Sequence, residues 1–249
     1  NGNTTINGNV VASSVTFNHN LTKSGSGALT ITGTGSTLDG NVSVTGGSLV
    51  ITDFRSIGNN TSNISLGNAT TTAGNLIIGT GTTPSLAGLI TSRPIILNVS
   101  TASNSIYAHQ NGANPVVLNG AITKPVAGNA TLIFGGTNTT DNVVNVGIPA
   151  LGTGGIAKRG PGTWVLARTN AYTGATTISN GTLKIQADEH AIGKLQPLDG
   201  HDRLTIRIGK ASHIPLQRQG VGRSSQRQDP IAVAQSRQGD VLRCDSLAQ

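Results

Sequence analysis

The chain has 249 residues and a formal net charge of +7, yet only 11% of its residues are charged and 2% are aromatic. So little charge is not typical of ordinary disorder, and an apolar fraction of 35% is too low for a helical globule or a helical membrane protein. No apolar run approaches the roughly 18 residues that a transmembrane helix needs.

The sequence contains no methionine and begins NGNTTINGNV, without a signal peptide. We therefore expect a fragment or a processed segment of a longer chain. The single cysteine, Cys244, permits no internal disulfide, and we expect it to be an incidental thiol.

Short runs in which apolar and polar residues alternate predict strands throughout residues 1–187. In ALTIT, Leu29 and Ile31 fall on one face of a strand, and Thr30 and Thr32 fall on the other. Glycine and asparagine between the runs supply the positive φ of sharp corners. In chain order, the runs lie within 4–17, 28–32, 41–51, 73–81, 114–123, 129–138 and 142–147.

Two distant segments, 23–51 and 158–185, share one pattern of glycines and apolar residues. With one residue of slippage, the aligned pairs are Gly25 with Gly160, Gly27 with Gly162, Leu29 with Trp164, Ile31 with Leu166, Gly40 with Gly174, Val44 with Ile178, Gly47 with Gly181, Leu49 with Leu183 and Ile51 with Ile185. An internal repeat of this length predicts a solenoid of stacked coils. At roughly 20–25 residues per coil and about 4.8 Å per coil, residues 1–187 would form about eight coils.

The stretch GPGTWVLARTNAYTGATTISNGTLKI at 160–185 resembles the autotransporter-associated β-strand repeat, also called the passenger-associated transport repeat. That family's pattern is Gly-x-Gly-x-Leu-x-Leu, then Asn-x-Tyr-x-Gly-x-Thr-x-(Val/Ile), then a small residue followed by Gly-Thr-Leu. Trp164 stands where leucine is common, and the 23–51 segment lacks the Asn-x-Tyr element. The other matching positions, which we expect to be structural, are Gly160, Gly162, Leu166, Asn170, Tyr172, Gly174, Thr176, Ile178, Gly181, Thr182 and Leu183.

The resemblance implies an all-β fold, a right-handed single-stranded parallel β-helix, in a secreted or bacterial cell-surface protein. We expect this helix over residues 1–187. Residues 188–249 differ in composition, because glutamine and arginine become frequent and no asparagine follows Asn180. This tail is a disordered linker, a divergent cap or a shifted reading frame, with the last two favoured equally. We expect it to pack poorly, apart from one strand within 202–209.

Nucleic acid is not an expected partner. Residues 1–187 hold eight basic side chains and three acidic ones, and only Lys158 and Arg159 are adjacent. Proteins that bind nucleic acid concentrate such charge and interleave aromatic side chains. The Lys158–Arg159 pair is expected to lie at a solvated corner.

Catalysis also finds little support in these residues. Enzymes that cleave polysaccharides need clustered acids, or a cation held by acids. Residues 1–187 contain no glutamate, and Asp39, Asp53 and Asp141 lie far apart in the sequence. His19 and His109 have no partners at metal-ligand spacing. We expect no catalytic, cofactor-binding or metal-binding residues.

The aromatic residues of the repeat raise a different possibility. Trp164 and Tyr172 would form a sugar-stacking pair if both were exposed. Trp164 occupies an apolar position of the repeat, so we expect it in the core, while the place of Tyr172 stays open.

The leading hypothesis is a non-catalytic passenger or stalk that serves adhesion or surface presentation. Its expected partners are host-cell or extracellular polysaccharide or protein surfaces. The alternative is part of a β-helix enzyme that binds or cleaves polysaccharide with a site outside this sequence.

Overall fold

The computed structural model of the chain describes residues 3–8, 10–17, 19–58, 62–79, 89–109, 114–186, 203–207 and 241–244. Nearly all of the regular structure described is β-strand, and the 3₁₀ turn η1 (Phe54–Ile57) interrupts it. Most of the tail, and with it the expectation that the tail packs poorly, lies outside the described residues.

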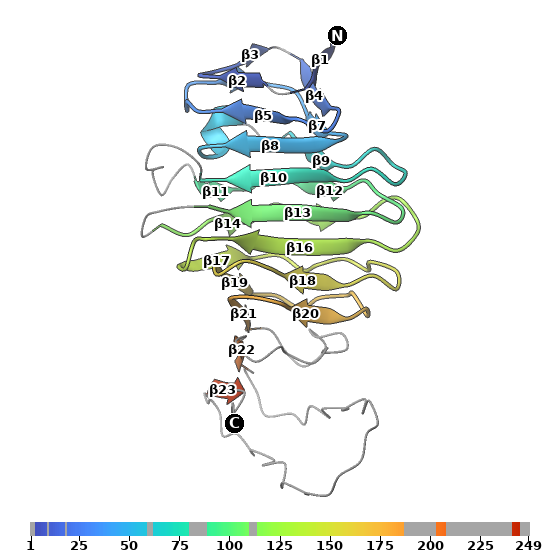
Figure 1. Cartoon of the computed structure of the whole chain (residues 1–249), viewed down its shortest axis with the longest axis vertical. Helices are drawn as coiled ribbons and strands as arrows, with labels where there is room; N and C mark the ends of the chain where they lie inside the picture. Colours follow the sequence, from blue (N-terminus) through green and yellow to red (C-terminus); the bar gives the residue numbers. More distant parts are fainter. Residues whose placement is uncertain are drawn as a thin grey trace, which may run out of the picture.

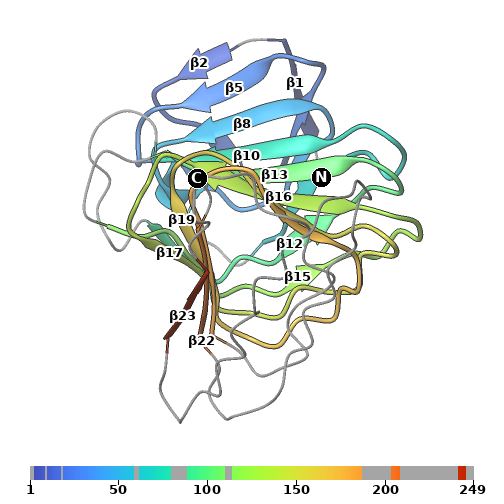
Figure 2. The same cartoon turned by 60° about the horizontal axis from the view of Figure 1, so that its bottom comes forward.

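The strands stack into three main sheets, which form the sides of a coil (Figures 1 and 2). Sheet 1 contains, in spatial order, β1 (Asn3–Asn7), β4 (Asn20–Ser24), β7 (Val42–Val44), β9 (Ile64–Leu66), β12 (Ile95–Leu97) and β15 (Ile122–Thr123). Sheet 2 contains β2 (Val10–Ala12), β5 (Ala28–Ile31), β8 (Gly47–Ile51), β10 (Gly74–Ile78), β13 (Ser103–Ala108), β16 (Thr131–Gly136), β18 (Ile156–Lys158) and β20 (Thr176–Ile178).

Sheet 3 forms the remaining side over most of the length of the coil. It contains β11 (Ile90–Thr91), β14 (Val117–Leu118), β17 (Asp141–Val144), β19 (Thr163–Leu166), β21 (Thr182–Ile185), β22 (Arg203–Arg207) and β23 (Val241–Cys244). Nearer the N-terminus, β3 (Thr16–Phe17) and β6 (Thr37–Leu38) follow the strands of sheet 2 and pair with each other.

Neighbouring coils pair in parallel. In sheet 2, Leu29 lies opposite Leu49, and Leu49 lies opposite Leu76. β5 pairs in parallel with β2 and β8, and β19 pairs in parallel with β17 and β21, so neither strand belongs to a hairpin. The expected parallel β-helix is therefore confirmed.

The coils differ in length more than expected. Leu29 and its register partner Leu49 are 20 residues apart, whereas Leu76 and its partner Ile106 are 30 residues apart. The registered strands nevertheless keep the same alternation, so the extra residues are accommodated between strands rather than within them. The length of each coil determines on which side of the coil the following segments lie. Two copies of one repeat can therefore lie on different sides.

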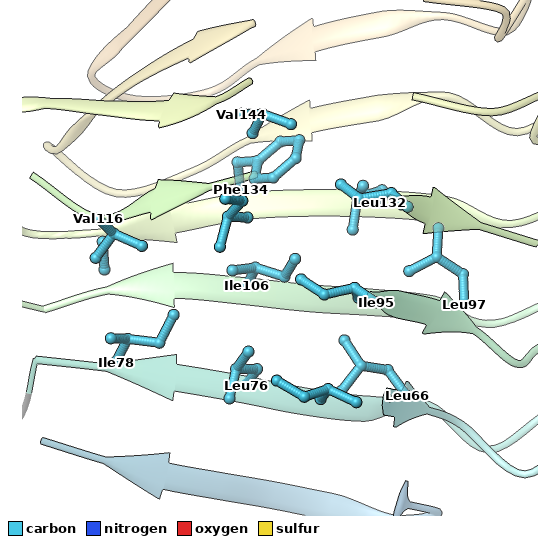
Figure 3. Packing of buried hydrophobic residues seen from close by; sticks show 14 of the residues in the cluster. Leu66, Leu76, Ile78, Ile95, Leu97, Ile106, Val116, Leu132, Phe134 and Val144 are labelled. Atoms are coloured by element: carbon cyan, nitrogen blue, oxygen red, sulfur yellow. The ribbon is translucent and has the colours of Figure 1, made fainter. Parts of the chain in front are cut away.

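A continuous hydrophobic core fills the coil. On β10, Leu76 and Ile78 are fully buried, while Ile77 between them is partly exposed on the outer face. Figure 3 shows side chains from neighbouring coils packed along the interior, including Leu66 and Ile95 of sheet 1. Full burial of such a side chain stabilises the fold by about 1.5–3 kcal/mol, and a single coil has no second layer against which to bury it.

The two copies of the repeat lie on different sides of the coil. In the first copy, β5 and β8 belong to sheet 2, whereas the equivalent strands β19 and β21 of the second copy belong to sheet 3. The corners before β5 and β19 nevertheless share one backbone conformation, with φ of +69° at Gly25 and +70° at Gly160. The repeat therefore encodes a corner and its flanking strands, and not a particular sheet.

Sheet 1 ends at β15, and the last two described coils complete this side without a strand. The ladder continues here through a side chain. The N–H of Ile148 donates to Oδ1 of Asn170 at 2.9 Å, and the N–H of Ala171 donates to the carbonyl of Ile148 at 2.8 Å. Asn170 thus supplies an acceptor that an ordinary strand would supply from its backbone.

The strand expected within 202–209 is present as β22, which extends sheet 3 in parallel with β21. β23 pairs antiparallel with β22, and its Cys244 lies opposite Leu204.

Candidate functional site

Two lysines occupy equivalent corners at the start of the two repeats. Lys23 precedes Gly25 by two residues, and Lys158 precedes Gly160 by two residues. Both lysine side chains are completely buried. The Nζ of Lys158 donates to the carbonyls of Arg159 at 3.0 Å, Gly160 at 2.6 Å and Asn180 at 3.0 Å. It therefore joins its own corner to the corner of the next coil.

Lys23 makes the same kind of contacts. Its Nζ donates to the carbonyls of Ser24, Gly25 at 3.1 Å and Gly46 at 3.5 Å. Burial lowers the pKa of Lys23 from its ordinary value. An ammonium group has three donors and no acceptor, so it suits a corner at which several carbonyl oxygens converge.

The prediction of a solvated corner at Lys158 and Arg159 is therefore wrong for Lys158. The sequence does contain a signal for this burial. Lys158 aligns with Lys23, and each lysine stands two residues before a glycine of positive φ. Arg159 is exposed, as expected. Both lysines use their donors within the backbone, so they serve the fold and are not free to bind an external anion.

A third buried cation, Arg93, lies between β11 and β12 and is 2% exposed. Its Nη1 donates to the carbonyls of Ile57 at 2.9 Å and Gly58 at 3.3 Å. Nε and Nη2 find no partner among the described residues, and burial lowers the pKa of Arg93 to about 10. A buried donor without a partner costs free energy. The two unsatisfied donors of Arg93 therefore offset part of the stabilisation that its hydrogen bonds to Ile57 and Gly58 provide.

The residues that match the repeat extend over two successive coils, because β19 and β21 pair in parallel and Trp164 lies opposite Leu183. Strand positions on β19, β20 and β21 are held by Trp164, Leu166, Thr176, Ile178, Thr182 and Leu183. The corners and the connection between strands are held by Gly160, Gly162, Asn170, Tyr172, Gly174 and Gly181.

The aromatic side chains of the repeat are both buried. Trp164 is 0% exposed, lies 4.9 Å from the ring of Phe134 and donates from Nε1 to the carbonyl of Gly135 at 2.9 Å. Tyr172 is 2% exposed, and its hydroxyl is 2.9 Å from Oγ1 of Thr176. Neither ring is accessible to a sugar, so the pair is not a stacking site.

The three aspartates of residues 1–187 do not meet. Asp53 is buried and caps η1, where it accepts from the N–H of Arg55 at 2.9 Å and pairs with its guanidinium at 2.6 Å. Asp141 pairs with Lys184 at 2.6 Å on the surface, two coils further along. Asp39 lies in the connection between β6 and β7. Within the described ranges, no cluster of three or more His, Cys, Asp or Glu side chains is placed to hold a metal ion.

The histidines differ from each other. The Nε2 of His19 is 2.7 Å from Oγ1 of Thr4 on the preceding coil. His109 stacks on Tyr107, with ring centroids 5.8 Å apart and an interplanar angle of 26°. Sequence reasoning missed this pair, although a spacing of two residues on a strand places both rings on one face.

In the part of the chain that is described, no helix has the length and apolar character needed to cross a membrane.

Comparison with known proteins agrees with the architecture. The model of the family described as Passenger-associated-transport-repeat matches residues 21–51 and 156–185, the two segments that hold the corner lysines. The adhesin BmaC autotransporter of Brucella suis biovar 1 (strain 1330) is 35% identical over 126 residues, which is 49% of this chain and 4% of that protein. The chain thus spans a small part of this relative's length. No solved structure gives a significant match.

Stacked parallel coils that carry two copies of this repeat define a repeat-built β-helix. The chain contains two copies of the passenger-associated transport repeat and is similar, over about half of its length, to an autotransporter adhesin. It is accordingly a secreted or bacterial cell-surface protein.

Proposed function

We propose that the chain is a non-catalytic stalk of a surface passenger, which holds adhesive surface away from the cell and contributes to adhesion. The observation that carries the proposal is the similarity to an adhesin together with an unbroken parallel ladder from β2 to β20 in sheet 2. Such a ladder resists bending because each strand bonds to the coil above and the coil below. We infer the adhesive role from the similarity to the adhesin, and the stalk role from the parallel ladder.

The non-catalytic part of the proposal is supported by the arrangement of the described acids. Asp53 is paired with Arg55, and Asp141 is paired with Lys184. General acid–base cleavage of a glycosidic bond needs two carboxyl groups across the bond.

Adhesion and turnover can be measured on the same preparation. Beads coated with the chain should bind to host-cell monolayers, while the chain releases no reducing ends from acidic or neutral polysaccharides. Leu49→Asp places a charge in the core and should abolish adhesion by unfolding the coil, whereas Ser48→Asp, on the outward-facing neighbour, should keep the fold. Turnover by the parent chain would favour the enzyme alternative, and absent adhesion would remove the adhesive role.

The division at residue 187 is part of the same proposal. We assign residues 1–187 to the stalk and 188–249 to a tail, on the change in composition after Asn180. Limited digestion with trypsin should leave a resistant fragment that ends near residue 187. Loss of residues 1–187 with survival of the tail would overturn this division.

A further inference from the structure

The outer face of sheet 2 carries a column of uncharged side chains. Val50 lies opposite Ile77, Ile77 opposite Tyr107, and Tyr107 opposite Gly135 in successive parallel registers. Among the strands of sheet 2, the one charged residue is Lys158, which is buried and bonded to corner carbonyls. No carboxylate therefore belongs to this face of the sheet.

The ring of Tyr107 packs against the backbone of the next coil at Gly135. A Cβ added to Gly135 would be only 2.3 Å from Cε1 of Tyr107, so the ring occupies the space above that glycine. His109 stacks beside it on the same face, and both residues are partly exposed. The two stacked rings thus lie against the sheet while both residues remain partly accessible to solvent.

An exposed cation follows on the next coil. Because Lys158 lies opposite Phe134, Arg159 comes next to Gly135, and its carbonyl oxygen is 3.2 Å from the Cβ position of that glycine. Strand alternation directs the side chain of Arg159 outward, since Lys158 points inward. Arg159 makes no ion pair with a described residue. β13, which carries Tyr107, and β18, which Arg159 directly follows, are two strand spacings apart, or about 10 Å.

We propose that Tyr107, His109 and Arg159 form a binding site for an acidic, uronate-containing saccharide. The proposal rests on the adhesive function above and names its ligand class. The negative face of the Tyr107 ring attracts the slightly positive C–H groups on one face of a pyranose. The guanidinium of Arg159 forms two parallel hydrogen bonds to the carboxylate of an adjoining sugar.

Other ligand classes fit this surface less well. An extended peptide adds to an open sheet edge, but β13 is already paired on both sides, with β10 and β16. A single-stranded nucleic acid needs a basic groove along its phosphates, whereas the described residues of this face offer one exposed cation, Arg159. A neutral saccharide would leave Arg159 unused.

The test is a titration of the full chain with a galacturonate hexamer and, in parallel, with its methyl ester, which has the same backbone without charge. The parent should bind the acid form at least about tenfold more tightly than the ester. Tyr107→Ala and Arg159→Gln should each weaken binding of the acid form about tenfold, which corresponds to about 1.4 kcal/mol. Arg159→Gln should also remove the preference for the acid form.

Three further variants separate binding from folding. Tyr107→Phe keeps the ring and should bind like the parent. Arg168→Gln removes another exposed arginine of the same chain and should have no effect. Gly135→Ala forces the ring to move and should weaken binding, and circular dichroism should show an unchanged β spectrum for every variant.

Several outcomes would overturn the proposal: no binding of the hexamer by the parent, equal binding of the ester, unchanged binding in Tyr107→Ala, or binding of a host protein alone. If Tyr107→Ala still adheres to host cells as the parent does, the site is wrong and the adhesive stalk stands. If the parent does not adhere at all, the proposed function fails independently of the saccharide result.

Discussion

Lys23 and Lys158 hold the same position in two repeats that lie on different sides of the coil, and both bind the carbonyls of a glycine corner. The corner carbonyls converge wherever a strand turns sharply into the next side. An ammonium group placed there satisfies them in both coils at once. Both copies of the repeat therefore use the same local arrangement to turn the chain.

Replacing Lys158 with methionine should destabilise the chain by about 2 kcal/mol, because charged hydrogen bonds to three carbonyls are lost. The matched control is Lys184→Met, which removes an exposed pair with Asp141 and should cost less than about 1 kcal/mol. Urea unfolding of both variants measures the difference. Equal losses would mean that the buried ammonium contributes no more than a surface ion pair.

Gly47 should not tolerate a side chain. Its φ is +68°, and a Cβ would come within 2.1 Å of the carbonyl oxygen of Gly27 on the preceding coil. Gly47→Ala should therefore lower the free energy of unfolding by about 2 kcal/mol or more, through backbone strain and the clash. Gly35→Ala meets no atom within 4 Å and should be nearly neutral. Similar thermal midpoints for the two variants would contradict the close packing of the corners.

Trp164 should be the most sensitive position in the second repeat. Trp164→Ala removes a fully buried ring and a hydrogen bond to Gly135, at an expected cost of about 3–5 kcal/mol. Trp164→Phe keeps contact with Phe134 and should retain more than half of that stability. Chemical denaturation followed by far-ultraviolet circular dichroism distinguishes the two variants. If Trp164→Ala lost less than about 3 kcal/mol of the free energy of unfolding, Trp164 would not lie in the core.

His109 should make stability depend on pH on the acid side. Burial lowers its pKa in the folded chain below the ordinary value of 6.5, so the unfolded chain binds the proton more readily. The contribution of His109 to the free energy of unfolding is therefore complete above pH 6.5, and it declines as the pH falls from 6.5 toward the pKa of the folded chain. His109→Gln should show a smaller drop in thermal midpoint between pH 7 and pH 5 than the parent. Parallel curves for the two chains would refute the assignment.

Much of the fold follows from the sequence because its information is local. Leu29 and Ile31 flank Thr30, and Leu49 and Ile51 flank the outward-facing Val50. The structure buries all four, with Leu29 opposite Leu49 and Ile31 opposite Ile51. The side on which each repeat lies does not follow, because it depends on the accumulated lengths of coils such as that between Leu76 and Ile106.

The residues of interest for function were harder to find. Lysine is rarely buried, so the general rule predicts an exposed Lys158, whereas the side chain is buried. The alignment of Lys158 with Lys23 is the feature of the sequence that indicates a shared role. The pair of Tyr107 and His109 depends on Gly135, which is more than 20 residues away in the chain and meets Tyr107 only through the parallel register. Such contacts between coils are invisible until the register is known.

The central claim is that successive coils stack in parallel and in register, and a distance along sheet 2 tests it most directly. Nitroxide labels are placed at Ser48 and Thr177, two outward positions, in a chain whose Cys244 is replaced by serine. The register between them runs through Asn75, Ser105, Ile133 and Ala157. Five strand spacings predict a separation of about 24 Å by double electron–electron resonance. A distribution without a maximum in that region would contradict the stacked coil.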